Sequence, residues 1–91
     1  MRKNYNEFNI EINDNKVKVD VSLLHTDRYE CQFSEKEIIT ALGAKGFTVT
    51  KTMVGIKEVH FIAILLNGKT KLTIEMMQEI WNQIPQEDLP K

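Results

Sequence analysis

The sequence predicts an α+β fold: a single small domain with the element order βββαββα, a largely antiparallel sheet and two helices packed on one face. Apolar and polar residues alternate through the first third of the chain and again after residue 46, as strands require, whereas residues 34–46 and 73–84 have helical spacing. The 91 residues suit one domain, expected to comprise residues 1–84, followed by a short, loose acidic tail of residues 85–91.

The N-terminal segment predicts a β-hairpin. A two-residue turn is expected at Asp14-Asn15, because Asp and Asn tolerate the positive φ that such a turn needs. This turn pairs Ile12 with Val17 and places Glu11 opposite Lys18. It also gathers six apolar residues on one face, namely Phe8, Ile10, Ile12, Val17, Val19 and Val21.

A third strand is expected over residues 28–33, after a turn at Thr26-Asp27. The first helix should begin at Ser34, which stands three residues before Glu37 in the spacing of a capping box. Gly43 or Gly46 can end this helix.

The second half of the chain predicts two strands and a helix. Residues 47–53 alternate and are rich in β-branched side chains, which favours a strand. Residues 59–66 are apolar on both faces, which is typical of a central strand. Thr73 can cap the last helix, and Pro85 ends it.

The string AILLNGKT, residues 63–70, fits the loosest form of a phosphate-binding loop. Its apolar residues complete the preceding strand, however, and Gly68 is its one glycine, so we interpret it as a strand end followed by an Asn-Gly turn. A narrower prediction remains, in which Lys69, Lys71 and the start of the last helix attract an anion weakly. No cofactor is expected.

No catalytic or metal site is predicted, and the chain is not expected to be an enzyme. His25, Asp27, Cys31 and His60 lack the spacing of metal ligands. Cys31 falls at an inward strand position, where Cys packs as a small hydrophobe. As the one cysteine it has no partner for an internal disulfide, which favours a reducing, cytoplasmic setting.

A nucleic-acid-binding module of winged or sheet type is one functional hypothesis. Residues 45–71 carry five lysines against one glutamate, a net of +4. Phosphate contacts are predicted for Lys51, Lys57, Lys69 and Lys71. In a second version Thr48–Glu58 is a recognition helix, although Gly55 argues against it. A net charge of −1 and only two arginines weaken both versions.

The preferred hypothesis is a small non-enzymatic cytoplasmic binding protein, an inhibitor or regulator from a phage or mobile element that acts through protein–protein contact. The phage origin rests on the abundance of Ile, Lys and Asn, residues with AT-rich codons. A homodimer through an edge strand or the last helix is also expected, and a membrane span is not. The predicted partner-binding residues, on the last helix and the tail, are Met76, Glu79, Gln83, Glu87 and Asp88.

Overall fold

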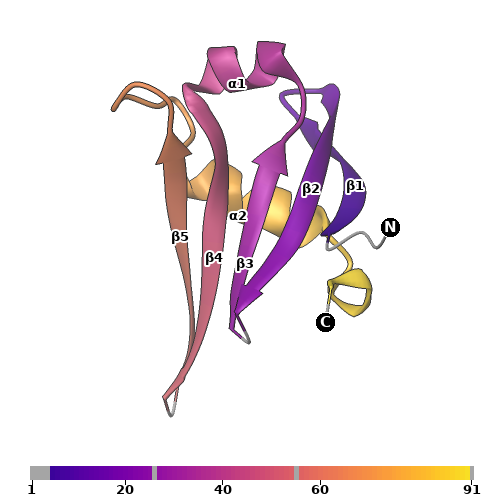
Figure 1. Cartoon of the computed structure of the whole chain (residues 1–91), viewed down its shortest axis with the longest axis vertical. Coiled ribbons are helices and arrows are strands. Elements are labelled where there is room, and N and C mark those ends of the chain that lie inside the picture. The colour runs from indigo at the N-terminus through magenta and orange to yellow at the C-terminus, as the bar shows by residue number, and fades with distance from the viewer. Residues whose placement is uncertain (1–4, 26, 55, 91) are drawn as a thin grey trace.

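The computed structural model describes residues 5–25, 27–54 and 56–90, with the backbone alone for Tyr5, residues 52–54 and residues 56–58. The described strands form one antiparallel sheet in the order β1-β2-β3-β4-β5, so each strand lies beside its neighbours in the chain (Figure 1). The strands are β1 (Tyr5–Ile12), β2 (Asn15–His25), β3 (Arg28–Phe33), β4 (Ala44–Val54) and β5 (Ile56–Leu65). With the two helices, this meander confirms the predicted α+β fold in the order βββαββα.

One face of the sheet carries the hydrophobic core. Helix α2 (Ile74–Gln83) lies across that face and runs from the β5 side to the β1 side (Figure 1). Helix α1 (Lys36–Leu42) lies at one end of the sheet and adds its buried Leu42 to the same core. The sheet contributes alternate residues of four strands, namely Ile10, Ile12, Val17, Val19, Val21, Cys31, Phe33, Phe47 and Val49.

The β1–β2 hairpin is present, but its register differs from the predicted one. The positive φ angles fall at Asn13 and Asp14, so the turn lies one residue earlier than expected. Ile10 therefore pairs with Val17, and Glu11 lies opposite Lys16 rather than Lys18. Both candidate turns consist of residues that tolerate positive φ, and a two-residue change of register leaves every side chain on its predicted face.

Of three predictions for the helix ends, one is wrong and two are confirmed. The predicted capping box at Ser34 is wrong, because α1 has Glu35 as its N-cap without a side-chain hydrogen bond, while Ser34 Oγ donates to the Lys18 carbonyl at 3.5 Å. Gly43 ends α1 in the left-handed conformation, with φ of 69°. Thr73 caps α2, since its Oγ1 accepts the Met76 amide at 3.1 Å.

Strand β5 lies at an edge of the sheet, so the prediction of a central strand for residues 59–66 is wrong. Within the described chain β5 pairs with β4, and its other long side faces away from the sheet. The segment is apolar enough for a central position, but the meander leaves it at the end of the strand order. Val59, Ile62 and Leu65 of this strand are consequently exposed.

The backbone also tests the predictions for residues 48–58 and 63–70. Residues 48–54 belong to β4, so the recognition-helix version of Thr48–Glu58 is wrong, although Gly55 lies outside the described residues. Thr26, half of the predicted turn before β3, lies outside them as well. The string at residues 63–70 begins as the end of β5, and Gly68 adopts a positive φ of 77°, as the strand-and-turn interpretation requires.

The C-terminal segment is folded rather than loose. A short 3-10 helix, η1 (Gln86–Asp88), follows α2, and Leu89 is buried in the core. The Asn6 side-chain amide donates to the Asp88 carbonyl at 2.5 Å. The segment therefore packs beside β1. Burial of Leu89 stabilises this position, because a free tail would expose its apolar surface to water.

Candidate functional site

Lys51, a predicted phosphate contact, lies on the core face of the sheet. Its Nζ is 5.5 Å from the ring centroids of both Tyr29 and Trp81, which are themselves 5.6 Å apart. The same Nζ donates to Gln86 Oε1 at 3.0 Å. The ammonium group is therefore engaged in cation–π contacts and a hydrogen bond that join β4 to α2 and η1.

Lys69 and Lys71 lie at the other end of the sheet, beside the C-terminus of α1. With Thr70 and residues 40–43 they line a hollow of about 280 Å³. The Leu42 carbonyl there accepts from Thr70 Oγ1 at 2.7 Å and from the Lys71 amide at 2.8 Å. These contacts fasten the loop to α1, whose C-terminal end disfavours anions. The weak anion site at Lys69, Lys71 and the start of α2 stays a prediction.

Lys51 is not brought together with Lys69 and Lys71. Lys51 is seven positions along β4 from Ala44, which pairs with Leu65 at the end where Lys69 and Lys71 lie. At the rise of a strand this separation is roughly 23 Å. The Lys57 side chain lies outside the described residues.

Gln83, a predicted partner-binding residue, is committed to an internal contact. Its Oε1 accepts the Glu11 amide at 2.7 Å, and its Nε2 donates to the Glu11 carbonyl at 2.9 Å. The carboxamide thus pairs with β1 as the next strand would, on the side away from β2. This contact closes part of the β1 edge of the sheet.

The other predicted partner-binding residues lie on α2 and η1, and two of them make contacts within the fold. Met76 is half-buried and packs against the core, and the carbonyl of Asp88 is bonded to Asn6. Glu79 and Glu87 have exposed side chains on α2 and η1. A hollow of only about 20 Å³ lies beside Met76 and Glu79, too small for a side chain of a partner.

Cys31 has no catalytic surroundings. It lies on the core face opposite Val21 and Phe47, fully buried. Burial raises the pKa of its thiol to about 12, with a smaller contribution from the Glu30 charge. His60 is exposed and pairs with Thr50, and its chain neighbour Phe61 pairs with the core residue Val49. Successive residues of a strand point to opposite faces, so His60 lies on the face opposite to Cys31.

The thiol pKa predicts a loss of stability in base. Between about pH 9 and pH 10 the protein should lose about 1 kcal/mol of unfolding free energy beyond the loss shown by a Cys31→Ala variant. The folded pKa is raised from 9.0 to about 12, so this contribution is complete below pH 9.0 and is lost as the pH rises toward 12. Urea titrations at both pH values measure it, and equal losses in the two proteins would contradict it.

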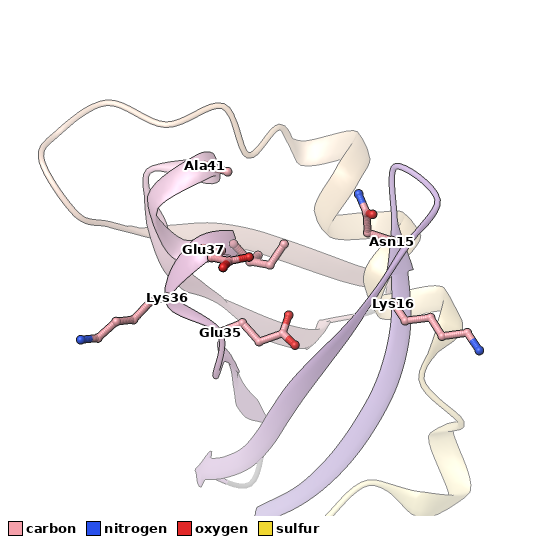
Figure 2. A pocket seen from close by; sticks show the side chains of 7 residues that line it. Asn15, Lys16, Glu35, Lys36, Glu37 and Ala41 are labelled. Atoms are coloured by element: carbon pink, nitrogen blue, oxygen red, sulfur yellow. The ribbon is translucent and has the colours of Figure 1, made fainter.

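A wide hollow lies between α1 and the β1–β2 turn (Figure 2). It measures about 740 Å³ and is lined by Asn15, Lys16, Glu35, Lys36, Glu37, Ile38 and Ala41. Figure 2 shows Lys16 and Lys36 pointing away from it on opposite sides. All the lining side chains except Ile38 are exposed, so the hollow is open surface without a buried polar group to hold a ligand. Among the described residues, moreover, no three His, Cys, Asp or Glu side chains could share a metal ion.

The most unusual surface of the molecule is the β5 edge, by which we mean residues 59–66. These eight residues include no Lys, Arg, Asp or Glu. Four of the six exposed large hydrophobic side chains in the described chain fall here, namely Val59 (42% exposed), Ile62 (63%), Leu65 (43%) and Leu66 (40%). Sheet edges in natural proteins normally carry charges or are covered. The charged residues of β5, Lys57 and Glu58, come before this segment, and residues 59–66 themselves have neither protection.

The backbone of the β5 edge is oriented for pairing. Across β3 and β4, the Lys51 amide donates to the Asp27 carbonyl at 2.8 Å. The alternation of an antiparallel ladder then directs the backbone groups of Thr48 and Thr50 toward β5. Their partners Ile62 and His60 face β4, so the N–H and C=O groups of Phe61 and Ala63 point away from the sheet.

The apolar pattern of residues 59–66 is compatible with two positions in a sheet. Apolarity on both faces of a strand indicates burial, which a sheet provides at its centre and a binding partner provides at its edge.

Comparison of the chain with protein-family models, curated proteins and solved structures gave no significant match. No helix in the described ranges is both long and apolar enough to cross a bilayer.

Proposed function

We propose that this is a small, non-enzymatic cytoplasmic protein that binds another protein by strand addition at the β5 edge. The observation that carries the proposal is the apolar part of the edge strand, residues 59–66, which has no charged residue and whose outward backbone groups have no neighbouring strand in the described chain. Strand addition supplies main-chain hydrogen bonds to such an edge, and side-chain contacts on both faces supply specificity.

The partner that fits this edge is an extended, apolar segment. Toward the core face it would meet Val59 and Leu65, and toward the open face it would meet Ile62. Full burial of an aliphatic side chain is worth about 1.5–3 kcal/mol, so covering part of several such side chains is enough for a specific contact. A protein of this kind acts by occupying its partner, which is the mode of an inhibitor or regulator.

The alternative surfaces have less support. The acidic surface expected on α2 and the tail loses Gln83 to the Glu11 backbone and Met76 largely to the core. For nucleic acid, Lys51 is held between Tyr29 and Trp81, far along the sheet from Lys69. Protein binding at the β5 edge is therefore the better-supported function.

A display library of random peptides tests the proposal with two variants of matched design. Ile62→Lys places a charge on the β5 edge, whereas Ile74→Lys changes an isoleucine of nearly equal exposure, 61% against 63%, on α2. We expect the wild type to enrich peptides with alternating apolar residues. These peptides should bind Ile74→Lys equally and bind Ile62→Lys at least about tenfold more weakly. No enrichment, or peptides that bind all three proteins alike, would refute the function.

A further inference from the structure

The geometry points to a second copy of this chain as the occupant of the β5 edge, so that two sheets join through antiparallel β5 strands about a two-fold axis. This inference rests on the proposed use of that edge: a second copy pairs with it where no segment of another protein does. Two-fold dimers are the commonest oligomers, and their interface uses the same patch on both subunits. The β5 edge must therefore be complementary to itself.

The outward direction of the Phe61 and Ala63 backbone groups restricts the register. In an antiparallel pair, residues whose backbone groups point outward must lie opposite one another. Because such residues alternate along β5, opposite residues differ by an even number of positions, and the two-fold axis passes through a single residue. Centring on Ile62 places Phe61 opposite Ala63 of the second copy and Val59 opposite Leu65 of the second copy. This register pairs all of residues 59–65 without a charged side chain.

The two adjacent symmetric registers are poorer. Centring on Phe61 brings Lys57 opposite Leu65 of the second copy and Glu58 opposite Ile64 of the second copy. Centring on Ala63 extends the pairing beyond Leu65, where β5 ends. The longest uncharged pairing within the strand is therefore the one centred on Ile62.

Side-chain sizes on the core face also suit this register. Within one sheet Ala63 already pairs with Phe47, whose ring is 6.2 Å from that of Phe61. Phe61 of the second copy would lie on the other side of Ala63. The small Ala63 side chain would then stand between two large ones, Phe47 and Phe61 of the second copy. By symmetry the same arrangement forms twice, with large and small residues opposite each other as close packing requires.

The other edge of the sheet explains why assembly would stop at two copies. On β1 the Gln83 carboxamide hydrogen-bonds to the N–H and C=O groups of Glu11. Glu7 and Glu11 also place charges along this strand. An edge protected in this way does not accept a further strand. Joining through β5 alone closes the assembly as a dimer rather than extending it into a fibre.

Light scattering during size-exclusion chromatography measures the assembly from about 1 to about 100 μM, the range of micromolar association. We expect the wild type and Ile74→Lys to show twice the chain mass of 10.6 kDa. In Ile62→Lys two lysines meet at the axis, which should raise the dissociation constant at least about tenfold while leaving the circular dichroism spectrum unchanged. A monomeric wild type at the highest concentration would overturn the dimer, as would an undiminished Ile62→Lys dimer.

A cysteine cross-link tests the register. Opposite residues at a non-hydrogen-bonded pair have Cα atoms about 4.5 Å apart, within the range that a disulfide spans. Ile62→Cys should therefore form a covalent dimer on mild oxidation, whereas Ile74→Cys should not, and the buried Cys31 does not interfere. Failure of Ile62→Cys to cross-link faster than Ile74→Cys would reject this register.

The dimer and the proposed function fail in distinguishable ways. A monomeric wild type that still enriches peptides sensitive to Ile62→Lys would reject the dimer and leave partner binding intact. A dimer sensitive to Ile62→Lys that enriches no peptide would show that the edge serves self-assembly alone, which rejects binding to another protein.

Discussion

Replacing Phe47 with alanine is expected to lower the free energy of unfolding by about 4 kcal/mol. Phe47 is fully buried on β4, and its ring lies between those of Phe33, 6.4 Å away, and Phe61, 6.2 Å away. The substitution removes most of the ring's apolar burial and leaves a cavity that strands on either side prevent from closing. A domain of this length has a total stability of roughly 5–14 kcal/mol, so the variant should lie close to unfolding.

Phe8→Ala is the matched control, because Phe8 packs against the same core from a half-buried position on β1. Its loss should be about half as large, since less of its surface is removed from water. Urea titrations of both variants are best done in the Ile62→Lys background, so that association does not add to the measured stability. The prediction fails if Phe8→Ala loses as much as Phe47→Ala.

The elements of the fold were largely predictable because they depend on local patterns. The alternation around Val17, the left-handed Gly43 and the Thr73 cap each act within a few residues of the chain. The hairpin register was less predictable, since Asn13-Asp14 and Asp14-Asn15 are nearly equivalent as turns. Local sequence therefore predicts which element forms better than it predicts which residues pair across two strands.

The position of β5 in the sheet was not predictable from its composition. Residues 59–66 show that the strand needs cover on both faces, but they do not show whether a strand of the same chain provides it. In this fold the chain after β5 turns away to form α2 rather than a sixth strand. The mismatch between the apolar strand and its edge position is therefore the main observation behind the proposed binding.

Two side chains of the candidate site illustrate the limit of sequence reasoning. Gln83 reaches the Glu11 backbone across 72 positions, and Lys51 reaches Gln86 across 35. Polarity in the sequence alone assigns both side chains to a binding partner. Such residues bind within the fold because α2 crosses the sheet from the β5 side to the β1 side, a tertiary arrangement that neither local segment contains.

Replacing Gly46 with alanine is expected to cost about 3 kcal/mol or more, because the added methyl group has no space. A Cβ at Gly46 would lie 1.9 Å from the Cys31 carbonyl oxygen and 2.9 Å from the Gln32 Cα. Both are backbone atoms of β3, so no side-chain rotation relieves the clash. The β3–β4 pairing beside the irregularity at Ala44 and Gly46 must open instead.

Gly68→Ala separates this steric effect from the general cost of replacing a glycine. Gly68 has a positive φ of 77°, but a Cβ there meets nothing within 4 Å. Its alanine variant should lose only about 1 kcal/mol, the backbone strain of the left-handed conformation. Thermal and urea unfolding of the two variants should therefore differ by about 2 kcal/mol or more, and similar losses would mean that β3 and β4 can move apart at little cost.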